Sequence, residues 1–219
     1  MPCCERNPVQ LIAEHVVVEE GLEQHYEVLK ELGDCHASLG NHDRARQCYE
    51  EARVLAPEKA GPAVGLGVVE LQVGRLDAAE RAFRTAADLE PACAEAYGGL
   101  AMVRQHRGKY ADAFDLYMTC LDKDADNLVA LLGLFQTSCQ MGSFARVIHY
   151  LEVYLDRHPG DTSVLYCLAT LRARDGALDE ARQALEMILA LEPGNAEAAD
   201  LLRDVRRRQH YPAEETVRS

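Results

Sequence analysis

The sequence is short of basic residues. It contains 23 lysines and arginines against 36 aspartates and glutamates, which gives a formal net charge of −13 at pH 7. Nucleic-acid binding needs basic clusters that neutralise phosphates, and attraction to anionic membrane surfaces needs positive charge as well. The charge balance therefore argues against both classes of partner.

Long apolar runs are also missing. No stretch approaches the roughly 18 consecutive apolar residues that a membrane-spanning helix requires. The N-terminal residues show no basic region followed by an apolar one, which is the pattern of a secretory signal. We therefore expect a cytoplasmic protein with no direct membrane insertion.

The eight cysteines form no metal-binding pattern. Six of them are scattered along the chain, without a Cys-x-x-Cys pair or a zinc-type spacing to histidine. In a reducing compartment such residues act as small apolar side chains, so we expect no metal, no other cofactor and no disulfide. Cys3 and Cys4 are the exception. This adjacent pair could bind a soft metal, become oxidised, carry a lipid or have no role.

A strict 34-residue period runs through most of the chain. Glycines recur at this spacing just after amphipathic segments, where a helix ends and the backbone turns with positive φ. They are Gly40, Gly74, Gly108, Gly142 and Gly176. The same step relates Ala45, Ala79, Ala113, Val147 and Ala181. It also relates large apolar residues, at Tyr49, Phe83, Tyr117, Leu151 and Leu185, and prolines, at Pro57, Pro91, Pro159 and Pro193.

This pattern resembles the tetratricopeptide repeat, a 34-residue helix-turn-helix unit with glycine, alanine, aromatic and proline landmarks. The resemblance implies an all-α fold, a right-handed superhelical solenoid of five repeats, because one helix pair cannot bury its own apolar surface. The expected repeats are 26–59, 60–93, 94–127, 128–161 and 162–195. Residues 196–219 are then a capping helix and a disordered tail, with Ala198, Leu201, Leu202 and Val205 facing the last repeat. Large residues at Leu76, Tyr110, Phe144 and Leu178 precede the second helices and are typical of hydrophobic staples.

Residues 1–25 form an N-terminal tail and helix with two possible arrangements. Asn7 and Pro8 are typical of an N-cap and a first helical position. Ile12 and Val16 fall where the second helix of a preceding repeat would have its alanine and phenylalanine. The segment is therefore either a degenerate half-repeat that covers the first repeat or a detachable helix that occupies the groove.

The family resemblance implies that partners bind in a concave groove lined by the first helix of each repeat. At these positions the sequence has an apolar strip with a polar rim, which predicts binding of a protein partner with an apolar face, an amphipathic helix or an extended peptide. The expected groove residues are Lys30, Asp34, Val64, Gly65, Val68, Leu71, Gln72, Gly99, Met102, His106, Leu132, Gln136, Cys139, Gln140, Tyr166, Thr170 and Arg174.

Three glycines, Gly65, Gly99 and Gly133, share one column of this groove. Glycine inside a helix costs about 0.5–1 kcal/mol relative to alanine, so the row requires a reason. It predicts either that a ligand approaches the helix closely or that neighbouring first helices crowd together.

The carboxylate clamp of co-chaperone family members is not expected here. Its five positions, which hold Lys, Asn, Asn, Lys and Arg in those proteins, hold Lys30, Asp34, Gly65, Glu95 and Gly99, and only Lys30 matches. The chain also lacks a glycine-rich phosphate loop and a histidine beside a nucleophile, so we expect no enzymatic activity. Two functions stay open: an adaptor or chaperone-like module that binds one partner, and a scaffold that self-associates through its groove and terminal helices.

The fourth repeat departs most from the pattern. Other repeats pair two small residues where their helices cross, such as Gly67 and Ala79, but the fourth pairs Phe135 with Val147. Interiors are close-packed, so two large residues cannot fit there without moving a helix. The preceding junction also has Ala125 in place of proline. We therefore expect the fourth helix pair to be splayed.

Overall fold

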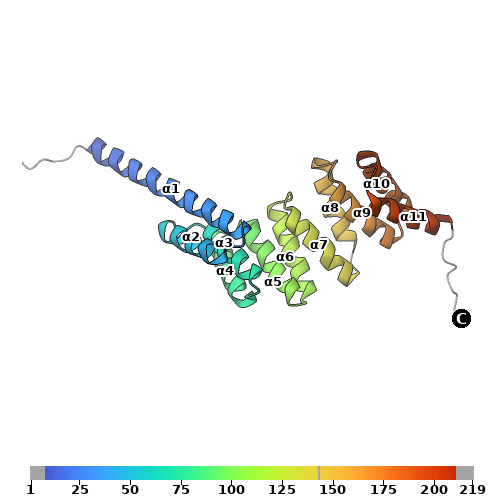
Figure 1. Ribbon diagram of the computed structural model, residues 1–219, viewed down its shortest axis with the longest axis horizontal. Coiled ribbons are helices and arrows are strands. Elements are labelled where there is room, and N and C mark those ends of the chain that lie inside the picture. Colours follow the sequence, from blue (N-terminus) through green and yellow to red (C-terminus); the bar gives the residue numbers. More distant parts are fainter. Residues whose placement is uncertain (1–7, 143, 211–219) are drawn as a thin grey trace, which may run out of the picture. The chain divides into compact units, whose positions relative to one another are not determined.

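The computed structural model describes residues 8–142 and 144–210, with side chains from residue 21 onward (Figure 1). This part of the chain is all-helical and contains no strand. Cys3, Cys4 and the tail from Tyr211 lie outside the described residues. The helices are α1 (Pro8–Ser38), α2 (His42–Leu55), α3 (Gly61–Gln72), α4 (Leu76–Leu89), α5 (Ala94–His106), α6 (Tyr110–Lys123), α7 (Leu128–Met141), α8 (Ala145–Arg157), α9 (Thr162–Asp175), α10 (Leu178–Leu191) and α11 (Ala196–His210).

The periodic landmarks have the local conformations that the sequence predicts. All five periodic glycines have positive φ, between 71° and 90°. Gly142, for example, caps α7, and its amide donates to the carbonyl of Ser138 at 2.8 Å. Residues with a Cβ rarely adopt this conformation, so glycine ends each first helix and lets the chain reverse. The periodic alanines and Val147 are fully buried in the second helices.

The helices form two compact units, one with α1 to α5 and the other with α6 to α11. Within each unit, helices that follow each other in sequence pack together. First helices also contact each other between pairs, α1 with α3 and α3 with α5 in one unit, and α7 with α9 and α9 with α11 in the other. Second helices of neighbouring pairs make no comparable contact in the part of the chain described. The first-helix layer is therefore the inner, more crowded side of each unit.

The N-terminal segment is not a separate helix. α1 begins at Pro8, as the Asn7-Pro8 pair predicted, but it continues without interruption to Ser38. Residues 8–25 therefore extend the helix that packs on α2, and in Figure 1 the N-terminal part of α1 projects beyond its neighbours. This continuous helix differs from both predicted arrangements, the half-repeat and the groove-blocking helix. The physical reason is that no proline interrupts the chain between Pro8 and Ser38.

α11 is the cap that the sequence predicted. Ala198, Leu202 and Val205 are buried against the preceding helices. The helix starts after Asn195, whose side-chain oxygen accepts a hydrogen bond from the amide of Ala198 at 3.0 Å. On the outer face, Arg206 forms an ion pair with Glu186 of α10 at 3.0 Å. One apolar face and one charged face let this helix end the stack.

Two ion pairs join successive helix pairs in the first unit, and the order of the basic and the acidic residue is reversed between them. Arg46 of α2 contacts Glu70 of α3 at 2.9 Å, and 34 residues later Glu80 of α4 contacts Arg104 of α5, also at 2.9 Å. The Glu70 and Glu80 side chains are each only 11% exposed. These carboxylates are therefore largely removed from water, and each depends on its arginine partner.

The contact between α7 and α8 of the fourth helix pair is limited, which agrees with the looseness expected from Phe135 and Val147. α7 and α8 approach each other over a much shorter stretch than α9 and α10 do. Val147 is fully buried, whereas Phe135 stays partly exposed. Only one of the two large residues is therefore fully enclosed at the crossing.

We expect this joint to open more readily than its neighbours. Amides of α7 and α8 should exchange with solvent about tenfold faster than those of α3 and α4, a difference of about 1.4 kcal/mol in local opening. Hydrogen–deuterium exchange followed by mass spectrometry measures this directly. Equal protection of the two helix pairs would contradict the expectation.

Candidate functional site

The inner face of the first unit carries an apolar strip. Val68 and Leu71 of α3 and Met102 of α5 reach the surface there, and Val68 is 38% exposed. Gln72 and His106, at the ends of the same helices, are exposed beside them. Val64, expected in the same strip, instead packs partly against the alanine-rich cluster between α3, α4 and α5. The strip is therefore formed by three residues in this unit, with a polar border.

The polar pair on α1 has a structural role. Lys30 donates to Asp34 at 3.1 Å, and the hydroxyl of Tyr49 donates to the other oxygen of Asp34 at 2.7 Å. Burial raises the pKa of Tyr49, and the hydrogen bond to Asp34 raises it further. The same carboxylate raises the pKa of Lys30 through its hydrogen bond. Asp34 thus holds the Tyr49 ring in place, and both of its carboxylate oxygens already accept a hydrogen bond.

The glycine row serves packing between helix pairs. A Cβ on Gly65 would lie 2.4 Å from the Tyr49 ring, and one on Gly99 would lie 2.3 Å from the Phe83 ring. In the second unit, a Cβ on Gly133 would lie 2.2 Å from the Tyr117 ring. Each glycine therefore makes room for an aromatic ring of the preceding second helix. Gly65 and Gly99 are buried, so the expectation that they line a binding surface is wrong.

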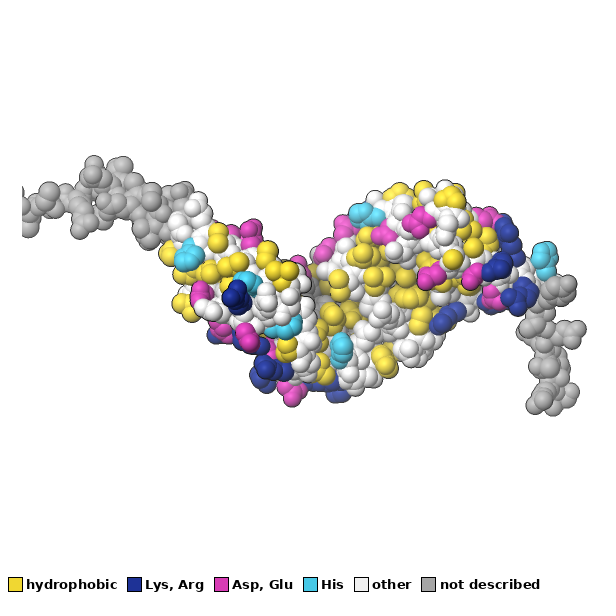
Figure 2. Space-filling view, viewed as in Figure 1, with side chains coloured by type: hydrophobic (Ala, Val, Ile, Leu, Met, Phe, Trp, Pro, Cys, Tyr) yellow, Lys and Arg dark blue, Asp and Glu magenta, His cyan; other side chains and the backbone are white. Residues whose placement is uncertain are grey.

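The inner face of the second unit is also apolar. Val129 of α7 is 60% exposed, and Leu132 and Cys139 on the same helix are half-buried. Tyr166 of α9 is half-buried next to them, and Thr170 donates to its carbonyl at 2.8 Å. Figure 2 shows apolar side chains over much of this unit's visible face, with basic side chains gathered at its C-terminal end, where α11 lies.

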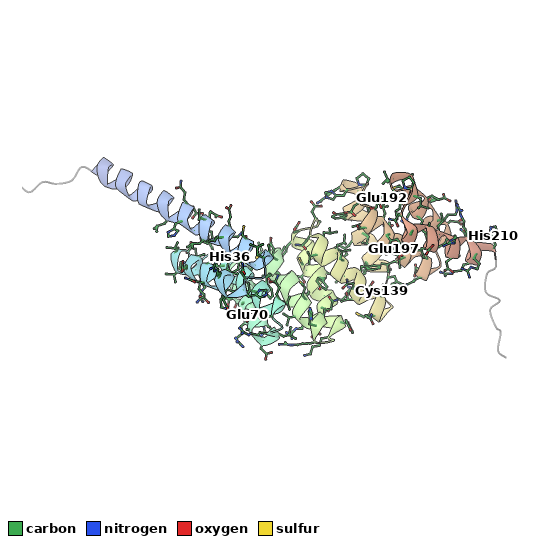
Figure 3. All side chains as sticks on the ribbon, viewed as in Figure 1. His36, Glu70, Cys139, Glu192, Glu197 and His210 are labelled. Carbon is green, nitrogen blue, oxygen red and sulfur yellow. The ribbon has the colours of Figure 1, made fainter. Side chains whose placement is uncertain are left out.

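Carboxylates from the cap border Tyr166. Burial raises the pKa of this tyrosine, and the negative charges of Glu197 and Asp200 on α11 raise it further. Figure 3 shows Glu197 on the cap and Cys139 on α7 of the same unit. Sequence reasoning missed Glu197 and Asp200 because they lie beyond the last repeat, where the 34-residue period gives no position for them.

The predicted groove residues thus fall into three classes. The exposed ones are Asp34, Val68, Gln72, His106, Gln136, Gln140 and Arg174. The half-buried ones are Lys30, Val64, Leu71, Met102, Leu132, Cys139, Tyr166 and Thr170. Only Gly65 and Gly99 are buried. Val129, on the first helix of the fourth repeat, is exposed as well.

The cysteines are mostly core residues. Cys48, Cys93, Cys120 and Cys167 are buried, and burial raises the pKa of Cys167 to about 11. A thiol with such a pKa stays protonated near neutral pH and is a poor nucleophile. Within the described residues, no three His, Cys, Asp or Glu side chains gather to hold a metal ion. None of the helices described has the length and apolar character to span a membrane.

Family models of the tetratricopeptide repeat match residues 26–59, 64–127 and 140–205. No curated protein matches the chain.

Several solved structures have a similar fold. YrrB, described as a tetratricopeptide repeat protein with an unusual peptide-binding site, is 21% identical, with a TM-score of 0.64 over 74% of this chain and 84% of that chain. PilF of Pseudomonas aeruginosa is 18% identical, with a TM-score of 0.69 over 88% and 95%. MamA is 19% identical, with a TM-score of 0.61 over 80% and 96%.

These identities are low, so the structural likeness by itself shows the fold alone. The three family matches together span most of the chain, and they coincide with helix pairs whose glycine turns and buried alanines follow the same period. The chain therefore belongs to the tetratricopeptide repeat family and is a protein–protein interaction module.

Proposed function

We propose that the protein is a non-catalytic adaptor that binds an apolar segment of a partner protein, an amphipathic helix or an extended peptide, on its first-helix face. The observation that carries this proposal is the surplus of apolar side chains on that face. Val68 and Val129 are exposed there, and Leu71, Met102 and Leu132 are half-buried. Apolar surface with a polar border is typical of a protein-binding site.

The outer helices α2 and α4 are mainly charged or polar where they are exposed, with Val54 and Leu89 as isolated apolar positions. On α2 the exposed positions are mainly charged or polar, for example Arg44, Gln47 and Glu51. α4 presents Arg81, Arg84, Thr85 and Asp88 in the same way. Since the crowded inner layer is the apolar one, a ligand that buries its own apolar face gains most by docking there.

The polar groups on this face favour recognition of side chains over recognition of a terminal carboxylate. Lys30 is paired with Asp34, and Gly65 and Gly99 are covered by aromatic rings. A clamp for a free C-terminus would need several unpaired donors at these positions. The peptide-binding site named for YrrB supports a peptide ligand here by analogy with a protein of the same fold.

The test is peptide selection on the full chain, followed by affinity measurements with matched variants. Val68→Glu and Val129→Glu place a carboxylate on the proposed face of each unit. Val54→Glu is the control, because Val54 is 79% exposed on the outer helix α2. We expect the inner variant in the unit that binds the selected peptide to weaken binding by about tenfold or more, since a charge facing an apolar ligand loses its hydration. Circular dichroism should show unchanged helix content in all three variants.

Two results would reject this proposal. The first is loss of binding in Val54→Glu with both inner variants unaffected. The second is the formation of large assemblies, which the alternative function predicts: a scaffold that self-associates through the same face and the terminal helices. Light scattering over a concentration series should show a species of constant small mass. Large assemblies that Val68→Glu or Val129→Glu dissolve would favour the scaffold.

A further inference from the structure

A polar cavity lies at the turn between α1 and α2, on the edge of the first unit. Its volume is about 430 Å³. It is lined by the turn residues Gly40 and Asn41, by His42, Asp43, Arg44 and Arg46 of α2, and by Val73 and Arg75 after α3. None of these residues belongs to the apolar strip of the first-helix face. We call this cavity the turn pocket.

His42 breaks the pattern of the other repeats at this position. The residues 34, 68, 102 and 136 places further on are Leu76, Tyr110, Phe144 and Leu178, all large and mostly apolar. In the first repeat a polar ring takes this place, and its Nδ1 atom is buried without a hydrogen-bond partner. A buried polar atom left unpaired is destabilising, because its lost hydration is not replaced. Such an atom in a native protein calls for a missing partner, an ion or a water.

A buried carboxylate arranges the arginines of the turn pocket. Glu70 of α3 (Figure 3) accepts from Arg46 at 2.9 Å and from Arg75 at 3.4 Å. Arg46 is also fixed by Asp43 at 2.9 Å. Arg44 is exposed and forms no ion pair with any residue that the structure describes. Three guanidinium groups thus face two carboxylates, an excess of positive charge in a chain of net charge −13.

The first turn of α2 adds donors to the same place. The side chain of Asn41, at the N-cap position, makes no capping hydrogen bond. The first amides of a helix have no partner within the helix, so those of α2 are left for solvent or a ligand. The positive end of the helix dipole favours an anion there. The imidazole, the guanidinium groups and these amides all offer hydrogen-bond donors.

From this geometry we propose that the turn pocket binds an oxyanion presented by a polypeptide, a carboxylate or a phosphoryl group on a side chain. Arg44 and the amides of α2 supply the contacts, and the ring of His42 lines the pocket beside them. The excess charge is small and local, which suits one anionic group and not a polyanion such as nucleic acid. This site does not depend on the apolar face, because it is built from the edge of the unit.

The test is ¹H–¹⁵N NMR titration of the full chain with blocked pentapeptides Gly-Gly-X-Gly-Gly. X is glutamate, phosphoserine or serine, and inorganic phosphate is titrated separately. We expect saturable shifts of the amides of Asn41, His42 and Arg44 with the glutamate or the phosphoserine peptide, with dissociation constants on the order of millimolar. The arm that binds more tightly identifies the oxyanion. The serine peptide should cause none of these shifts.

Variants decide whether the turn pocket is responsible. His42→Leu introduces the residue found at this place in two other repeats, so the variant should fold, and Arg44→Gln removes only a charge. Each should weaken binding roughly fivefold or more, the loss expected for one charge-assisted hydrogen bond. Arg53→Gln is the matched control on α2, because Arg53 pairs with Glu50 outside the pocket.

The proposal is overturned if no anionic peptide gives saturable shifts, or if Arg53→Gln weakens binding as much as Arg44→Gln does. Shifts with inorganic phosphate and with neither anionic peptide would overturn it as well, because they would reduce the pocket to a site for free ions. Binding of the selected apolar peptides should be unchanged in His42→Leu and Arg44→Gln. Failure here therefore leaves the proposed function untouched.

Discussion

Replacing Gly99 with alanine should lower the free energy of unfolding by about 1–3 kcal/mol, the usual cost of overfilling a packed core. Alanine is the better helix former by about 1 kcal/mol, so propensity alone predicts the opposite sign. The added Cβ would lie 2.3 Å from the ring of Phe83, far inside van der Waals contact. The ring is itself fully buried and would meet the backbone of Gly67 if it moved the other way.

Urea unfolding followed by circular dichroism measures this change. Gly21→Ala is the matched control, because Gly21 lies inside helix α1 with nothing within 4 Å of the added Cβ. That variant should leave the stability unchanged or raise it. A second variant adds Phe83→Leu to Gly99→Ala and imitates the junction between the fourth and fifth repeats, where Leu151 and Cys167 hold the corresponding positions. The double variant should recover part of the loss, whereas a stabilising Gly99→Ala would contradict this account of the glycine row.

The sequence alone was enough to predict the features that each helix pair determines within itself. The periodic glycines require a left-handed turn wherever they occur, so their positive φ followed from position. The alanines mark a close crossing inside one pair, and their burial followed in the same way. The large residues Phe135 and Val147 predicted a looser fourth pair for the same reason, because they occupy the crossing position at which the other repeats have small residues.

Features that involve two pairs, or the ends of the chain, were harder to predict. The period placed Gly65 in a column of the inner face but could not show that the ring of Tyr49 fills the space beside it. α1 lacks a preceding repeat for comparison, so the sequence could not show that its N-terminal extension is one continuous helix. His42 was visible in the sequence as a departure from its column. Its significance depends on a buried, unpaired nitrogen that only coordinates reveal.

The ion pairs between helix pairs lead to the last prediction. Glu80→Arg should lower the free energy of unfolding by about 3 kcal/mol, the lower end of the range for breaking a buried ion pair. The new arginine would face Arg104, whose side chain is 20% exposed, and would lose the contact that Glu80 makes with Arg84. Reversing a surface pair should matter far less. Glu50→Arg, next to Arg53, serves as the control and should cost at most about 1 kcal/mol.

Adding Arg104→Glu should restore about half of the loss or more, because residues in contact are coupled. The double variant recreates the order of charges that Arg46 and Glu70 already have one repeat earlier. A double-mutant cycle from urea unfolding measures the coupling, and its absence would show that the pair does not hold the two repeats together. The opposite polarity of successive pairs has a further consequence. If the first helix pair packed on the third instead of the second, Arg46 would face Arg104, so skipping a neighbour would bring like charges together. The alternation therefore favours the native order of the repeats as well as their stability.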